Sequence, residues 1–188
     1  MNSLIDIISE FDSPSHSYIV GLFGSKILFP LDITHHWFVV KHKNEIRRVE
    51  VLGLLSNTIQ EGNKAGLTYS QEDLFEGLHR NLFKYLSPLT LSSYILSSRF
   101  ETFNSGIVKG NKGSLAHKLS EFILHKSWEY PFLDRYEPFP SEGPNSNTYI
   151  SWVLERVSKS KQKLILPSTA HGKDYHLIQR EEYAIAAE

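Results

Sequence analysis

The sequence has 188 residues, of which 40% are hydrophobic and 12% aromatic. This is enough to bury one core and too little to require two, so we expect a single domain over residues 1–188. Its 20 basic and 21 acidic side chains give a net charge of -1. This excludes recruitment of nucleic acid by an overall positive electrostatic potential of the protein. Cysteine is absent, which excludes disulfides, zinc-thiolate sites and a cysteine nucleophile.

The N-terminal region lacks the pattern of a secretory leader. Acidic side chains at Asp6, Glu10 and Asp12 interrupt its apolar residues, and no later stretch approaches the length of about 18 apolar residues that a membrane span needs. We therefore expect no integral membrane segment and a cytoplasmic location.

The first part of the chain predicts a short helix and then strands. Apolar residues recur at helical spacing in Ser3–Phe11, and a turn sequence follows them. Glycines separate two brief apolar runs, Tyr18–Phe23 and Ile27–Phe29. Two stronger β-rich runs, Trp37–Val40 and Val49–Leu55, flank the short polar linker Lys41–Ile46, which predicts a hairpin.

The rest of the chain predicts helices joined by loops. Helical spacing is clear in Ser70–Leu86 and Ser114–Trp128, whereas Ser92–Phe103 fits either a strand or a loop. Glycines at positions 106, 110 and 113 predict a flexible connection. Prolines make Tyr130–Pro144 a rigid loop, a further helix follows it, and Leu164–Leu166 is predicted to be a short strand.

The start of that further helix, Asn145-Ser146-Asn147-Thr148, is the first candidate site. Unpaired N–H groups and the helix dipole at this position would stabilise an oxyanion beside Ser146. A serine hydroxyl attacks a carbonyl only when a base removes its proton. The alternative is structural, because Asn, Ser and Thr are the commonest helix caps.

A base is available in the stretch THHWFVVK. The two-residue period of a strand puts His35 on one face with Trp37 and puts His36 on the other, so we expect only one histidine to face the helix. Glu50 lies within the apolar run across the hairpin, where a carboxylate could orient an imidazole. The alternatives are ordinary strand-end histidines and a glutamate with a cross-strand partner.

The later stretch TAHGKDYH offers Lys173 and Asp174 after a glycine turn. These residues could bind an anion, or they could form a turn with a surface ion pair. The histidines show no convincing metal pattern, so we expect no metal and no cofactor. A metal held by His35, Glu50 and His171 is the weakest alternative.

Several blocks of the sequence together resemble an uncharacterised bacterial domain family of unknown function: HHWFVVK with VEVLG, HRNLF, EGPNSNTYISWV and LPSTAHGKDY. The resemblance covers about residues 34–175, and its most specific element is Pro144 to Thr148 followed by an aromatic residue. The family usually has His-Pro-Trp in the first block, so His35 matches its histidine and His36 replaces its proline. This favours His35 as the base.

The chain order is also similar, more distantly, to circularly permuted papain-like hydrolases and acyltransferases, including the lecithin:retinol acyltransferase group. There a histidine strand precedes a helix that opens with Asn-Cys; here Asn145-Ser146 stands in that place. The resemblance implies a permuted papain-like α+β fold, with an antiparallel sheet packed against helices. Ser146 would replace the cysteine, which a serine can do only with a stronger base.

We therefore predict a hydrolase or acyltransferase that acts on an amide or ester bond of a small-molecule, peptide or lipid acyl substrate. Its catalytic residues would be Ser146 as nucleophile, His35 as base and Glu50 as orienter, with backbone amides of Ser146 and Asn147 as oxyanion hole. Residues assigned to substrate binding are Asn145, Asn147, Thr148, Trp37, Lys173 and Asp174. The rival hypothesis is a non-catalytic binding module that uses the same groove and loop for polar recognition.

Overall fold

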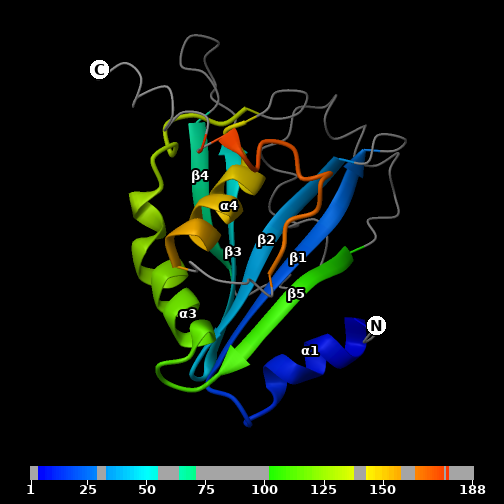
Figure 1. Ribbon diagram of the computed structural model, residues 1–188, viewed down its shortest axis with the longest axis vertical. Coiled ribbons are helices and arrows are strands. Elements are labelled where there is room, and N and C mark those ends of the chain that lie inside the picture. The colour runs from blue at the N-terminus through cyan, green and yellow to red at the C-terminus, as the bar shows by residue number, and fades with distance from the viewer. Residues whose placement is uncertain are drawn as a thin grey trace.

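The fold is an antiparallel sheet of five strands with helices on both of its faces (Figure 1). The computed structural model describes residues 4–28, 33–54, 64–70, 102–137, 143–157, 164–175 and 177. The predicted α+β class is confirmed. Within the described part of the chain, no helix combines the length and the apolar character needed to cross a membrane.

The strand order is β4-β3-β2-β1-β5. In chain order the elements are α1 (Leu4–Asp12), β1 (Tyr18–Leu28), β2 (Ile33–His42), β3 (Glu45–Leu54), β4 (Lys64–Ser70), β5 (Thr102–Gly110), α3 (Leu115–Lys126), the 3-10 turn η2 (Ser127–Glu129) and α4 (Ser146–Val157).

Most predicted elements of the first part are confirmed. Helix α1 (Leu4–Asp12) lies where a helix was predicted, and the hairpin joins β2 to β3 through a turn in which Lys43 has a positive φ of 58°. The two brief runs in 18–29 are one continuous strand, β1, because each of its glycines is paired on both sides, with β2 and β5, and does not turn the chain.

Two predictions for the later part are wrong. The glycines at 106 and 110 lie in strand β5, whose ladder with β1 supplies the backbone partners that a free loop would lack. Residues 164–166 form no strand; Ile165 N donates a single hydrogen bond to Ser105 O at 3.3 Å. The helices at 114–128 and after the proline-rich loop are confirmed as α3 and α4. Ser70, where a helix to Leu86 was predicted to begin, is the last residue of β4, and residues 71–86 and 92–101 lie outside the described residues.

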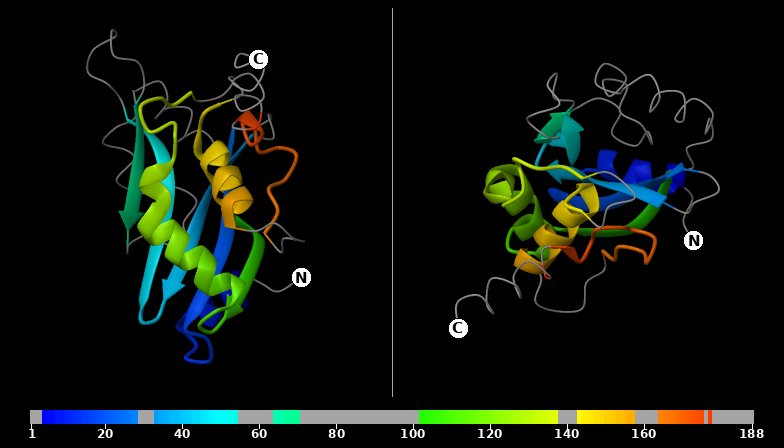
Figure 2. Two further views of the ribbon diagram at one scale, coloured as in Figure 1. Left: turned by 60° about the vertical axis from the view of Figure 1, so that its left-hand side comes forward. Right: turned by 90° about the horizontal axis from the view of Figure 1, so that it is seen from above.

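Alternation along the strands builds two cores. Phe38, Val40 and Val49 point to the face covered by α3 and α4, and Trp37 and Val39 point to the face covered by α1. Figure 2 shows α1 on the opposite side of the sheet from α3 and α4. Both faces of the central strands are therefore buried.

Strands β2 and β3 separate halfway along their length. They pair only from Phe38 opposite Val49 to His42 opposite Glu45, although β2 begins at Ile33 and β3 continues to Leu54. Beyond Phe38, β2 stays paired with β1 and β3 with β4. Figure 1 shows the two halves of the sheet diverging toward the end at which α4 begins. Helix α4 contacts both β2 and β3, and its first turn bonds to the end of β2 that has left β3.

A buried polar contact lies between α3 and α4, and its removal tests how α4 packs. Ser127 Oγ donates to Ile123 O at 2.6 Å and lies 2.6 Å from Tyr149 Oη, and both Ser127 and Tyr149 are fully buried. Ser127→Ala should lower the free energy of unfolding by about 1–3 kcal/mol, because it leaves the Tyr149 phenol without its partner. Urea denaturation measures the change.

Ser9→Ala is the control, because Ser9 is exposed on α1 and bonds only within its own helix turn. We expect a change within about 0.5 kcal/mol for this variant. Equal effects of the two substitutions would contradict the packing described for α4.

Candidate active site

The first turn of α4 is capped by Asn145. Its Oδ1 accepts from Asn147 N at 2.9 Å and from Thr148 N at 3.4 Å, and its carbonyl accepts from Tyr149 N at 3.1 Å. In return Thr148 Oγ1 accepts from Asn145 N at 3.1 Å, as in a capping box. The cap predicted for this stretch is therefore Asn145, and the Ser146 side chain is left for another partner.

Ser146 meets His35 across the gap between β2 and β3. Ser146 Oγ lies 2.8 Å from His35 Nδ1, and His35 Nε2 lies 2.7 Å from Glu50 Oε2. Both distances are those of good hydrogen bonds. All three side chains are shielded from water, with relative exposures of 3%, 9% and 0%. The structure thus brings together the three residues that the sequence analysis proposed as a catalytic set.

The direction of the hydrogen bonds follows from the carboxylate. Because an ionised Glu50 can only accept, the proton of a neutral His35 sits on Nε2, and Nδ1 carries a lone pair. That lone pair faces the Ser146 hydroxyl and can accept its proton. Glu50 therefore fixes the tautomer that makes His35 a base toward Ser146.

Arg48 keeps Glu50 ionised. Its Nε donates to Glu50 Oε1 at 2.7 Å and its Nη2 donates to Oε2 at 2.9 Å, and both residues are buried. Burial alone would raise the pKa of Glu50, but the Arg48 charge and the hydrogen bond from His35 outweigh it and bring the pKa to about 2. The carboxylate is thus charged at neutral pH.

Trp37 packs against both His35 and Arg48. Its ring stacks on His35 with centroids 6.0 Å apart, and the Arg48 guanidinium lies 4.1 Å from the ring centroid. Trp37 is fully buried beneath His35. The structure places this predicted substrate contact under the base, where it holds the imidazole and the guanidinium in position.

His36 also contacts α4, so the prediction that only one of the paired histidines faces the helix is wrong. His36 Nδ1 lies 2.9 Å from Asn147 Oδ1. Because β2 has left β3 here, the first turn of α4 can be reached from both sides of the strand. Burial lowers the pKa of His36 to about 4, against the opposing effect of this bond, so His36 is neutral.

The chain before Ser146 is held by a turn and by the loop that contains Tyr136. Gly143 has a φ of 131°, and a Cβ there would lie 2.8 Å from Thr148 Oγ1, so the turn needs glycine. Glu137 N donates to Pro144 O at 2.7 Å. The Tyr136 hydroxyl lies within hydrogen-bonding reach of the side chain and backbone of Ser146, and burial raises the pKa of Tyr136 to about 12.

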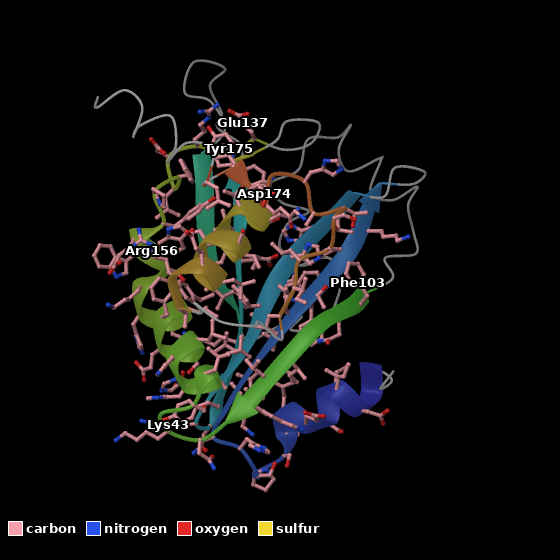
Figure 3. The ribbon with its side chains drawn as sticks, in the orientation of Figure 1. Lys43, Phe103, Glu137, Arg156, Asp174 and Tyr175 are labelled. Carbon is pink, nitrogen blue, oxygen red and sulfur yellow. The ribbon has the colours of Figure 1, made fainter. Side chains whose placement is uncertain are left out.

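The segment around 169–175 lies against the same end of α4. Thr148 Oγ1 donates to Gly172 O at 2.6 Å, and Figure 3 shows Asp174 and Tyr175 where α4 begins. Asp174 is exposed, and Lys173 Nζ donates to Pro167 O at 3.5 Å. The anion-binding role of these two residues stays a prediction.

Two residues of the site, Arg48 and Tyr136, were missed. Arg48 stands two positions before Glu50, so strand alternation puts both on one face and could have revealed the pair. The position of Tyr136 could not be inferred in this way, because the residues of a proline-rich loop follow no helix or strand periodicity. Among the described residues, His35, Glu50 and His171 do not form a group that could hold a metal ion.

Comparison with known proteins identifies one family. A sequence model of the family described as "Protein of unknown function (DUF3750)" matches residues 18–175. No curated protein and no solved structure matches the chain.

Glu50→Gln should lower the free energy of unfolding near pH 7 by about 3–5 kcal/mol, because it leaves the buried Arg48 charge without its counter-charge. The carboxyl pKa falls from 4.5 to about 2 on folding, so its contribution is present above pH 4.5 and is lost as the pH falls toward 2. The difference between the two proteins should shrink over this window, as urea denaturation at stepwise pH values will show.

Glu45→Gln is a matched control, because Glu45 pairs with Arg47 at the same spacing on the same strand, but in an exposed position. It should change the free energy of unfolding by no more than about 1 kcal/mol. A Glu50→Gln effect as small as this, or one that does not depend on pH, would contradict the buried ion pair.

Proposed function

The chain belongs to the DUF3750 family, and we propose that it is a serine-dependent hydrolase or acyltransferase acting on an amide or ester bond. One observation carries the proposal. A serine hydroxyl lies 2.8 Å from the free nitrogen of an imidazole whose other nitrogen lies 2.7 Å from a buried carboxylate. Nucleophile, base and orienter in hydrogen-bond contact are the diagnostic arrangement for nucleophilic acyl transfer.

In the first step, Ser146 Oγ attacks the carbonyl carbon of the substrate while its proton moves to His35 Nδ1. Glu50 stabilises the imidazolium that forms, since its Nε2–H already points at the carboxylate, and Arg48 holds that carboxylate in its ionised form. The tetrahedral intermediate then expels the amine or alcohol, which leaves with the proton from Nδ1. An acyl ester on Ser146 remains.

In the second step, a water or an acceptor alcohol or amine gives its proton to His35 Nδ1 and attacks the ester. Release of Ser146 Oγ with that proton restores the starting state. Water gives a hydrolase and another acceptor gives an acyltransferase; the two differ only in this step.

The oxyanion of the intermediate would be stabilised by Ser146 N–H and the Tyr136 hydroxyl. The N–H of Asn147, which the sequence analysis also assigned to this task, donates to Asn145 Oδ1. The Tyr136 hydroxyl lies against both the backbone and the side chain of Ser146, and a neutral phenol there can donate to an oxyanion.

A permuted papain-like fold is part of the proposal. It is supported by the order of the elements, a histidine strand first and a nucleophile helix later, and by the packing of α4 on an antiparallel sheet. The replacement of cysteine by serine asks for a stronger base. The buried Glu50 carboxylate, held by Arg48, orients His35 toward Ser146.

The non-catalytic binding module is the less favoured function. In that hypothesis Asn145, Asn147 and Thr148 would offer their polar groups to a ligand. Their side chains instead bond within the chain, to the helix backbone, to His36 and to carbonyls of 34, 171 and 172. Ser146 faces a base rather than a helix amide.

An activity-based fluorophosphonate probe tests the proposal. The wild-type protein should form one covalent adduct, and mass spectrometry of its peptides should locate the adduct on Ser146. Ser146→Ala should abolish labelling. His35→Ala should slow it by about 100-fold or more, because the hydroxyl then has no base.

Ser120→Ala is the control variant, since Ser120 is a buried serine beside a different histidine, His42, with Oγ and Nδ1 3.2 Å apart. It should label at the wild-type rate. Labelling that survives in Ser146→Ala, or a folded wild-type protein that does not label, would count against a serine nucleophile and in favour of a binding module.

A further inference from the structure

The residue next to the nucleophile, Asn147, makes three hydrogen bonds with one carboxamide. Its Nδ2 donates to Thr34 O at 2.9 Å and to His171 O at 3.0 Å, and its Oδ1 lies 2.9 Å from His36 Nδ1. The side chain is nearly fully buried, with 3% exposure. Both N–H groups of the carboxamide and its oxygen are therefore bonded to groups of the protein itself.

Two of these bonds reach the two neighbours of His35. Thr34 and His36 flank the base in β2, and Asn147 directly follows the nucleophile in α4. Hydrogen bonds to the residues on both sides of His35 fix the distance of β2 from α4 and the rotation of β2 about its own axis. The β2–β3 ladder cannot do this, since it ends at Phe38.

The orientation of the carboxamide also sets the state of His36. Because the carbonyls of Thr34 and His171 both accept hydrogen bonds, the Nδ2 group of Asn147 must point toward them. Its Oδ1 then faces His36, so His36 Nδ1 must carry the proton of that bond. His36 Nε2 then carries no proton, finds no hydrogen-bond partner within the described part of the chain, and packs against Gly24 and the Phe103 ring. The ring is thus buried whole, in the tautomer opposite to that of His35.

We propose that Asn147 is the positioning residue of the catalytic pair: it holds His35 against Ser146 by binding both neighbours of His35. The inference rests on the proposed function of Ser146 and His35. Asn147 contacts no reacting atom, so its effect is on geometry, and a displacement of about 1 Å in such a pair can cost about 100-fold in rate. The bond to His171 extends the same hold to the segment after residue 164.

The variants for the test are Asn147→Ala, which removes all three bonds, and Asn147→Asp. The aspartate has the same shape and can still accept from His36, but it turns an acceptor toward the two carbonyls. The control is Ser127→Ala, which weakens the packing of α4 at a buried bond to Tyr149, away from the pair. Thermal denaturation places the three variants on one stability scale.

The first readout is the rate of fluorophosphonate labelling at Ser146. We expect a fall of about 100-fold for Asn147→Ala and a smaller fall for Asn147→Asp, with Ser127→Ala near wild type despite its lower Tm. Labelling that follows Tm in the same way for all three variants would overturn the positioning role, because Asn147 would then act through stability alone.

The second readout does not depend on activity. ¹⁵N NMR of the imidazoles should show His35 protonated at Nε2 with a hydrogen-bonded Nδ1, and His36 protonated at Nδ1, in the wild type and in Ser127→Ala. In Asn147→Ala the hydrogen-bonded shift of His35 Nδ1 should be lost. If the wild type does not label but the shift is lost, the positioning stands and the catalytic function fails; an unchanged His35 shift overturns the positioning whatever the labelling shows.

Discussion

The site depends on one buried chain of hydrogen bonds that runs from Arg48 through Glu50 and His35 to Ser146. Each hydrogen bond in this series depends on the group that precedes it. The guanidinium keeps the carboxylate ionised in a dry environment, the carboxylate fixes the tautomer of the imidazole, and the imidazole turns its lone pair to the hydroxyl. A buried carboxylate without this partner would carry a large desolvation cost, so the ion pair serves stability and function together.

Space for this series of hydrogen bonds exists because β2 and β3 pair over only part of their length. Had β2 and β3 paired along their whole length, the side chains of His35 and Glu50 would lie flat on the face that packs on α1. Their separation beyond Phe38 lets the first turn of α4 settle over the gap and meet β2 on both sides. Asn145 accepts from the N–H groups of Asn147 and Thr148, so neither the Ser146 hydroxyl nor the Asn147 carboxamide is needed as a cap and each bonds to β2. The cap and the proposed nucleophile are therefore neighbouring residues.

Much of this could be predicted from local patterns. Hydrophobic period and cap residues located α1, α3, α4 and the β2–β3 hairpin, and the chemistry of Ser146, His35 and Glu50 singled them out as residues that need partners. The continuity of β1 and the existence of β5 could not be predicted, because glycine breaks a local pattern even where neighbouring strands hold the backbone. Nor could the contacts of Asn147 and Tyr136, which depend on where β2 leaves β3 and how the proline-rich loop returns to the helix start.

The central claim is that Ser146 becomes a nucleophile because His35 takes its proton at that place in the fold. A crystal structure of the protein after reaction with a small fluorophosphonate tests it most directly. We expect a phosphorus atom bonded to Ser146 Oγ, a phosphoryl oxygen directed at Ser146 N–H, and His35 still held on Glu50. An unmodified Ser146 in crystals of folded protein treated with excess reagent, or a phosphorus atom on another side chain, would contradict it.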